Sequence, residues 1–143
     1  MGKGTVVIGT IGSDCHTVGS WIIARSLEAE GFKVVRLGSC VLQKEFIEAS
    51  VETNADAIVV SSMYGLGFFD CQGFKDKCIE AGLQDIILYI GGYLTTVKDE
   101  SWSEVEKRFK EIGFDRVYSP DTEPLQAVED LDRDIQQRRR GRI

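Results

Sequence analysis

Residues 5–19 are TVVIGTIGSDCHTVG, a β-branched run followed by glycines and polar residues, with helical spacing beginning at Val18. Similar β-branched runs recur at Lys33–Leu37, Ala57–Val60, Ile86–Ile90 and Arg116–Tyr118. Continuous apolar runs are typical of parallel strands covered by helices on both faces. Three of the five runs have this character: VVI at 6–8, IVV at 58–60 and IIL at 86–88. We therefore expect these three to be the central strands of a sheet.

Segments with helical spacing alternate with the expected strands, at 18–30, 43–53, 73–81, 103–112 and 124–137. Gly31, Gly82 and Gly113 each follow one of these segments, where glycine commonly ends a helix in the left-handed conformation. Strict alternation with short connections implies right-handed crossovers. The sequence therefore predicts an α/β fold: a doubly wound, five-stranded parallel sheet of the flavodoxin-like (Rossmann-like) kind, with strand order 2-1-3-4-5.

The 143-residue chain is 43% hydrophobic and 28% charged, the composition of an ordinary globular protein. This length predicts a single domain over residues 1–143, with a core at about 3–137. Residues 138–143, which contain Arg138, Arg139, Arg140 and Arg142, are expected to form a solvated basic tail.

Charge and composition also exclude several classes of partner. A net charge of −6 would repel a nucleic-acid backbone, so no nucleic-acid partner is expected. No run approaches the roughly 18 apolar residues of a membrane span, and the chain enters its first strand without a signal peptide. Cys15, Cys40, Cys71 and Cys78 have no zinc-ligand spacing and are expected to be reduced. We therefore expect a cytoplasmic protein without a membrane partner.

Glycines and polar residues gather directly after three of the expected strands, at 12–19, 61–67 and 91–96. In the predicted strand order, strands one, three and four are adjacent. Ligands of such sheets bind outside the carboxyl ends of the strands, at the switch point between strands one and three. The three loops are therefore predicted to line one ligand-binding crevice.

His16 is the only histidine of the chain and stands in the first of these loops. It is either a metal ligand or an exposed or capping histidine, since imidazole has many uses. Asp14 is close enough in sequence to orient a ligating imidazole, but could equally form an Asx-turn or a helix cap. Ser61 and Ser62 could be plain strand-end hydroxyls. Gly91-Gly92 either forms a tight turn or lets a ligand approach the backbone.

The combination of Asp14-x-His16-x-x-Gly19, Ser61-x-Met63 and Gly91-Gly92 resembles the signature of cobalamin-binding domains that hold the coenzyme base-off, with histidine on cobalt. Four further stretches, at 11–16, 52–56, 60–65 and 105–110, resemble the small subunit of glutamate mutase, also called methylaspartate mutase. The resemblance covers roughly residues 3–128.

The resemblance implies a role for each matching residue. His16 would be the axial ligand to cobalt, and Asp14 would hydrogen-bond the far nitrogen of its ring. Gly19 would allow close packing of the helix start. Ser61, Met63 and Gly91-Gly92 would border a pocket for the displaced nucleotide tail, and residues 93–97 would complete its wall. The family usually has leucine at the Met63 position and a smaller polar residue at that of Tyr93. The full implied cofactor-binding set is Ser13, Asp14, Cys15, His16, Thr17, Gly19, Ser61, Ser62, Met63, Gly91, Gly92, Tyr93, Leu94, Thr95, Thr96 and Val97.

The resemblance also implies an activity. The chain would be the adenosylcobalamin-binding subunit of an isomerase that interconverts L-glutamate and threo-3-methylaspartate by a radical mechanism in glutamate fermentation. It would supply no catalytic side chain and would be inactive alone. Its partner would be a larger (β/α)₈-barrel subunit, with two small and two large subunits in a heterotetramer. The alternative is a stand-alone corrinoid carrier or cobalamin-binding module without mutase activity.

Two other classes share the expected topology and fit less well. A phospho-acceptor signalling domain needs an aspartate where Ser61 ends the third strand and a lysine where Pro120 follows the fifth. A flavodoxin needs a phosphate-binding loop rich in Ser and Thr after its first strand, where Asp14 and His16 stand. Both interpretations are therefore weak.

Overall fold

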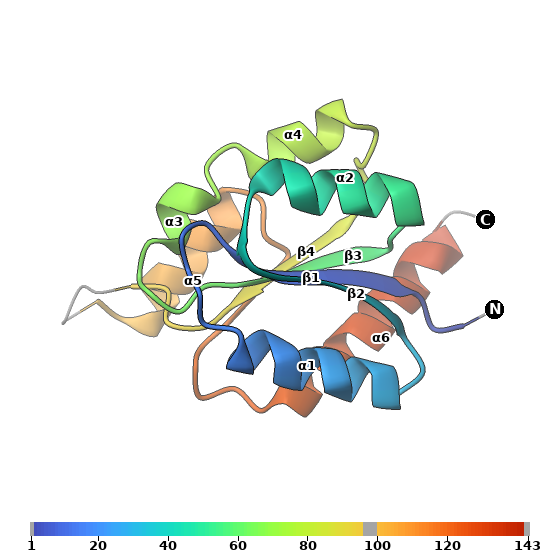
Figure 1. The fold of residues 1–143 in the computed structure, drawn as a ribbon, viewed down its shortest axis with the longest axis horizontal. Helices are drawn as coiled ribbons and strands as arrows, with labels where there is room; N and C mark the ends of the chain where they lie inside the picture. The colour runs from blue at the N-terminus through green and yellow to red at the C-terminus, as the bar shows by residue number, and fades with distance from the viewer. Residues whose placement is uncertain (1, 96–99, 142–143) are drawn as a thin grey trace.

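A single parallel sheet organises the computed structural model, which describes residues 2–95 and 100–141. The strand order is β2-β1-β3-β4-β5, and every pairing is parallel, as the sequence predicts (Figure 1). The strands are β1 (Thr5–Ile11), β2 (Lys33–Val41), β3 (Ala57–Ser61), β4 (Ile87–Gly91) and β5 (Arg116–Tyr118). Strand β3 is buried along its whole length, which explains its unbroken apolar character.

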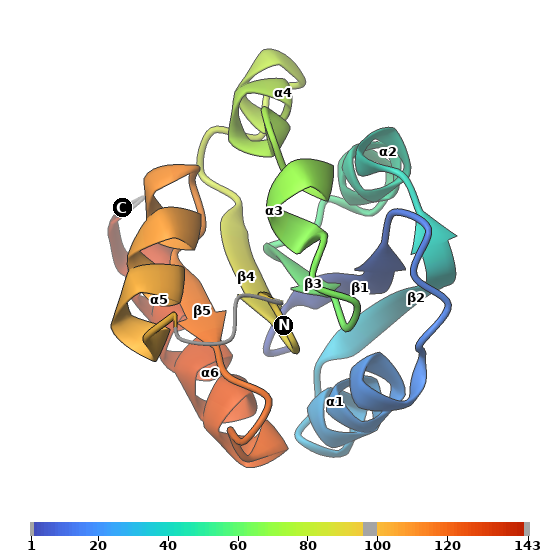
Figure 2. The same cartoon turned by 90° about the vertical axis from the view of Figure 1, so that its left-hand side faces the viewer.

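Helices cover both faces of the sheet (Figure 2). They are α1 (Val18–Ala29), α2 (Gln43–Thr53), α3 (Gly67–Asp70), α4 (Phe74–Glu80), α5 (Trp102–Glu111) and α6 (Pro124–Gly141). One core lies beneath α2, α4 and α5, with Phe46, Phe74 and Phe109 at its centre. The other joins α1 and α6 through Leu27 and Leu131. Among residues 2–95 and 100–141, no helix combines the length and the apolar character that crossing a bilayer requires.

Several helix ends lie where the sequence places them. Gly31, Gly82 and Gly113 have φ angles of 98°, 84° and 120°, the left-handed values expected after a helix. The Ser101 side chain accepts a hydrogen bond from the backbone N–H of Glu104, and Pro124 is the first residue of α6. The capping signals in the sequence therefore set these boundaries.

Other boundaries differ from the expectation. Strand β2 continues past Leu37 to Val41 through a bulge, where Gly38 and Cys40 adopt positive φ angles of 84° and 55°. The short helix α3 was not predicted. Helix α6 extends to Gly141, so the first arginines of the expected tail are helical. Arg139 lies 3.7 Å from the Asp56 carboxylate and donates to the Gly2 carbonyl, which ties the end of α6 to the N-terminal segment.

A polar network anchors α6 to the sheet. The Tyr89 hydroxyl donates to Asp134, which also accepts two hydrogen bonds from Arg116, at 2.8 and 3.0 Å. The Tyr118 hydroxyl donates to Asp130 at 2.6 Å. Burial opposes ionisation of Asp134, but the hydrogen bonds from Arg116 and Tyr89 outweigh it and lower its pKa. Asp134 is therefore a carboxylate that the fold holds in its charged form.

The lowered pKa of Asp134 predicts a specific acid sensitivity. A group with a depressed native pKa stabilises the fold above its unfolded pKa, and this stability is lost as pH falls through the native value. We expect Asp134→Asn to reduce the drop in unfolding free energy between pH 6 and pH 2, values that bracket the ordinary aspartate pKa of about 3.9. Urea unfolding at a series of pH values measures this, and an unchanged drop in the variant would contradict the role given to Asp134.

Candidate functional site

The loops that follow β1, β3 and β4 meet at the carboxyl edge of the sheet, the edge that faces the viewer in Figure 2. Backbone hydrogen bonds join the loops after β3 and β4: the Ser62 N–H donates to Gly91, and the Gly65 N–H donates to Tyr93. The Met63 N–H donates to the Asp14 carboxylate at 2.6 Å and so joins the loops after β1 and β3. The structure therefore brings together the three motifs that the sequence singled out.

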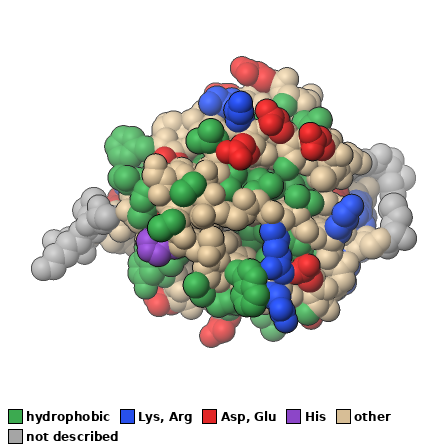
Figure 3. All heavy atoms as spheres, in the orientation of Figure 1, with side chains coloured by type: hydrophobic (Ala, Val, Ile, Leu, Met, Phe, Trp, Pro, Cys, Tyr) green, Lys and Arg blue, Asp and Glu red, His purple; other side chains and the backbone are tan. Residues whose placement is uncertain are grey.

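Asp14 and His16 form a closely coupled pair. Asp14 Oδ1 lies 2.6 Å from His16 Nδ1 and accepts the His16 backbone N–H at 3.0 Å. Two alternatives considered for Asp14 are thus both present: its carboxylate closes an Asx-turn and also contacts the imidazole. The Asp14 side chain is fully buried, whereas the His16 side chain is 64% exposed. The imidazole therefore faces solvent on a fixed, buried support, visible as the purple patch in Figure 3.

The charge on Asp14 fixes which ring nitrogen is free. Burial opposes its ionisation, but hydrogen bonds from the Met63 and His16 backbone and from the His16 ring lower its pKa. An ionised carboxylate only accepts hydrogen bonds, so the neutral imidazole must carry its proton on Nδ1. His16 Nε2 then presents its lone pair away from Asp14.

Thr10 was not predicted as a site residue, but it also holds the His16 loop through a hydrogen bond. It is fully buried near the end of β1, and its hydroxyl donates to the His16 carbonyl at 2.9 Å. The His16 backbone is thus held through both its N–H and its carbonyl. A threonine near the end of a strand gives no distinct signal, because such a hydroxyl is common there.

A cavity of about 260 Å³ opens beside this loop, between the sheet and helices α1 and α6. Its sheet side is formed by Ile8, Val59, Ser61 and Tyr89 from β1, β3 and β4. Met63, Gly91 and Gly92 border it at the carboxyl edge, and Gly19 lines its α1 side. The cavity therefore lies at the switch point of the sheet.

Two glycines shape this cavity in different ways. A Cβ atom on Gly19 would meet no heavy atom within 4 Å, so the expectation that Gly19 allows close packing of the helix start is wrong. Its missing side chain instead leaves cavity space open. Gly92 has φ +121°, and a Cβ there would overlap the Ser62 carbonyl oxygen and lie 2.7 Å from Met63 Sδ. Only glycine fits this turn.

Some of the expected site residues do not line the cavity. Ser62 is fully buried between Gly67 and Gly92, and its hydroxyl has no hydrogen-bond partner among the described residues. Leu94 belongs to the core on the α5 side, whereas Tyr93 is 57% exposed. The Thr95 hydroxyl donates to Glu100. Thr96 and Val97 lie outside the described residues. Ser13, Cys15 and Thr17 are exposed in the His16 loop.

The loop between β5 and α6 also lines the cavity, which the sequence did not lead us to expect. Its lining residues are Ser119, Pro120, Thr122, Glu123 and Pro124. Sequence reasoning interpreted this segment only as a helix start, because hydroxyl residues before a proline are the usual signal for one. Its place in the sheet order, two strands away from β3, gave no reason to expect it at the cavity.

The number of metal-ligating side chains near His16 limits the kind of metal that it could bind. No group of three or more His, Cys, Asp or Glu side chains that could hold a metal ion occurs within residues 2–95 and 100–141. His16 is therefore a single, oriented nitrogen donor beside an apolar cavity. Such a donor suits a metal that brings its own equatorial ligands, as a corrin does.

Comparison with known proteins agrees with this chemistry. The family model described as "B12 binding domain" matches residues 4–129. The "Glutamate mutase sigma subunit" of Fusobacterium nucleatum subsp. nucleatum is 54% identical over 94% of this chain and 98% of its own length. The protein of the same name from Clostridium tetani is 52% identical over the same shares.

A solved structure shares the fold. It is described as a novel cobalamin-binding protein from Desulfitobacterium hafniense and superposes with a TM-score of 0.73 at 26% identity. The match covers 91% of this chain and 58% of that one. The likeness is therefore to one part of a longer protein.

Proposed function

This chain belongs to the B12-binding-domain family and, within it, to the glutamate mutase sigma subunits, and on that premise we propose that it carries the cobalamin of a glutamate mutase. The observation that carries the proposal is the exposed His16 imidazole, fixed by the buried Asp14, in the loop next to an apolar cavity. Met63 connects the two, because it lines the cavity and its N–H bonds to Asp14. Both features fit a corrinoid, which needs one axial nitrogen and room for a displaced nucleotide.

Each group has a separate task in this proposal. His16 Nε2 would bind cobalt, and Asp14 would keep the proton on Nδ1 and raise the basicity of the ligand. The Met63 N–H holds the Asp14 carboxylate in place. Gly19, Ser61, Met63, Gly91 and Gly92 would border the nucleotide tail, together with the β5–α6 loop. The remaining residues assigned from the sequence around His16, and at 62 and 93–97, stay predictions.

The bound cofactor would be adenosylcobalamin, which supplies a carbon radical by homolysis of its cobalt–carbon bond. This chain would position the cofactor and exclude water from its lower face. No side chain of this chain is assigned to substrate. We propose that L-glutamate and threo-3-methylaspartate bind to the partner subunit, a larger (β/α)₈ barrel, in a complex with two copies of each chain.

The proposed setting is glutamate fermentation in the cytoplasm. Cys15, Cys40, Cys71 and Cys78 are all free thiols, as suits a reducing compartment. The alternative of a stand-alone corrinoid carrier is not favoured, because the chain matches glutamate mutase subunits over 98% of their length.

Reconstitution tests the proposed function directly. The chain is mixed with adenosylcobalamin and the large subunit of a glutamate mutase, and formation of methylaspartate from glutamate is followed. We expect activity only when both chains and the cofactor are present. Cobalamin binding without activity, across several large subunits, would instead support the carrier.

Gly19→Leu tests whether the cavity takes the nucleotide tail. A leucine side chain would fill open space next to the helix start, so the free energy of unfolding should not fall. Cobalamin affinity should fall by at least about tenfold, since the added side chain occupies the volume that the tail needs. Equilibrium dialysis measures the affinity. Ala29→Leu adds the same side chain at the exposed far end of α1 and should bind normally. Equal binding by both variants would contradict this use of the cavity.

A further inference from the structure

The Tyr64 side chain reaches from the loop after β3 to the loop that contains His16. Its hydroxyl accepts the Ser13 backbone N–H at 3.2 Å and donates to the Asp70 carboxylate. Burial and the bond to Asp70 raise the pKa of Tyr64 to about 12, so the hydroxyl keeps the proton that it donates. Ser13 directly precedes Asp14, so the contact acts on the backbone next to the Asp14–His16 pair.

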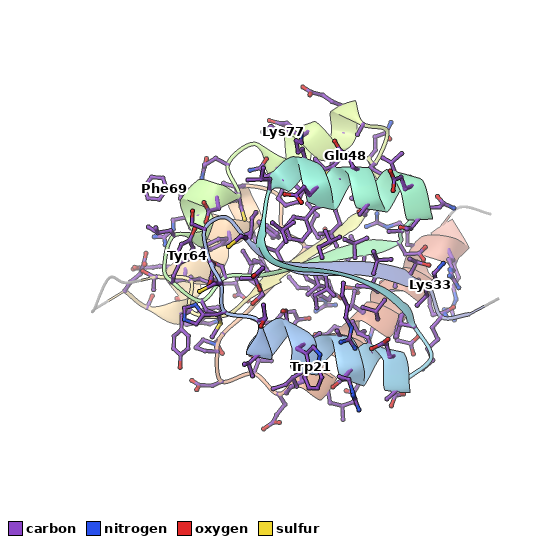
Figure 4. The ribbon with its side chains drawn as sticks, in the orientation of Figure 1. Trp21, Lys33, Glu48, Tyr64, Phe69 and Lys77 are labelled. Carbon is purple, nitrogen blue, oxygen red and sulfur yellow. The ribbon has the colours of Figure 1, made fainter. Side chains whose placement is uncertain are left out.

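Asp70 is itself firmly held. It is the last residue of α3, and its backbone carbonyl accepts a hydrogen bond from the Gln43 side chain of α2 at 2.6 Å. The same Gln43 amide donates to the Gln72 carbonyl at 2.9 Å. Figure 4 shows Tyr64 between the ribbon of α3 and the carboxyl edge of the sheet, while Phe69 points away from the sheet into solvent. Helix α3 is therefore a fixed support for Tyr64.

The neighbouring glycine shows how closely these groups approach. Gly12 has φ +77°, and a Cβ there would lie 2.5 Å from the Tyr64 hydroxyl and overlap the Asp70 carboxylate. The backbone before Asp14 thus lies directly against the Tyr64–Asp70 pair. With the bond from Met63 to Asp14, the His16 loop has two separate links to the loop after β3.

We propose that Tyr64 and Asp70 are positioning residues, which hold the Ser13 backbone so that Asp14 and His16 keep their geometry before the cofactor binds. The direction of Nε2 depends on the Asp14 carboxylate, and the position of that carboxylate depends on the backbone on both sides of it. Without the Tyr64 hydroxyl, only the Met63 N–H would link the two loops at this point. That this geometry serves cobalt ligation rests on the proposed function. That Tyr64 and Asp70 hold the His16 imidazole in one orientation does not depend on it.

The single histidine makes the proposal measurable in the protein alone. With ¹⁵N-labelled histidine, the imidazole nitrogens of His16 give one pair of NMR signals, whose shifts report the proton position. We expect wild type to show one tautomer, protonated at Nδ1. Tyr64→Phe and Asp70→Ala should show averaged or broadened signals, and the double variant should be no worse than either single one. Asp70→Asn keeps an acceptor for the Tyr64 hydroxyl and should resemble wild type.

Tyr118→Phe is the matched control for the imidazole signals. It removes the hydroxyl of another tyrosine that donates to an aspartate, Asp130 on α6, on the opposite face of the sheet. Its His16 signals should match those of wild type. If Tyr64→Phe also kept the wild-type signals, the positioning role would be wrong, and the same holds if Tyr118→Phe disturbed them equally.

The cobalamin affinity of the same variants provides a second measurement. Loss of one hydrogen bond should weaken affinity by about three- to tenfold in Tyr64→Phe, with less nitrogen ligation in the Co(II) spectrum. If the imidazole signals change but wild type binds no cobalamin, the positioning role holds and the proposed function fails. If wild type binds cobalamin and Tyr64→Phe binds it identically with unchanged signals, the positioning role fails alone.

Discussion

Replacing His16 with alanine is expected to weaken cobalamin binding by about a hundredfold or more, because it removes the imidazole nitrogen that we propose as the cobalt ligand. Loss of groups that merely orient a ligand costs 10- to 100-fold, so loss of the ligand itself should reach at least the upper limit. Absorbance titration with cobalamin measures the affinity. The bound spectrum should also change, since the axial nitrogen is gone.

The same variant should fold normally. The His16 side chain is 64% exposed, so truncation removes little buried area. The buried Asp14 carboxylate loses its hydrogen bond to the ring but keeps those from the Met63 and residue-16 backbone N–H groups. Urea unfolding at neutral pH should give a free energy within about 1.5 kcal/mol of wild type, the contribution of one hydrogen bond. A stable variant that binds cobalamin as tightly as wild type would contradict the role of His16.

Gly92→Ala is expected to lower the free energy of unfolding by about 3 kcal/mol, the upper range for a strained backbone conformation. The Cβ would overlap the Ser62 carbonyl oxygen at a φ of +121°, which alanine rarely adopts. Ser62 cannot easily move away, since its N–H donates to the Gly91 carbonyl. Relief of the overlap would separate the loops after β3 and β4. Urea unfolding measures the stability loss.

Gly82→Ala is the control that separates the cost of a left-handed backbone conformation from the cost of the steric overlap in Gly92→Ala. Gly82 has φ +84°, but a Cβ there would meet no heavy atom within 4 Å. The free energy of unfolding of Gly82→Ala should therefore fall by only about 1 kcal/mol, the cost of the left-handed conformation alone. Equal losses in the two variants would show that the contact with Ser62 contributes nothing.

The sheet could be predicted from the sequence because its central strands are buried on both faces. The runs at 6–8 and 58–60 are apolar without interruption, and only one environment explains this. Strand β2 is at an edge and half exposed, so its extension through Gly38 to Val41 left no comparable pattern. Helix α3 has four residues, too few for helical spacing to be detected.

The candidate site was predictable only in part, for a related reason. Asp14 and His16 lie two residues apart, so the sequence itself limits their separation. Tyr64 contacts Ser13 across 51 residues, and the β5–α6 loop reaches the cavity from still farther along the chain, so no local pattern records either contact. Thr10 lies six residues before His16, but a hydroxyl near a strand end gives no distinct signal. Gly19 shows a different limit: the motif marks the position, but the space beside it belongs to the cavity rather than to packing.

Electron paramagnetic resonance of Co(II)-cobalamin bound to protein with ¹⁵N-labelled histidine tests the central claim most directly. A ¹⁴N axial ligand splits each cobalt line into three, and a ¹⁵N ligand splits it into two. With His16 on cobalt, the unlabelled protein should give triplets and the labelled protein doublets. Triplets that persist in the labelled protein would place a nitrogen of the cofactor on cobalt and contradict ligation by His16.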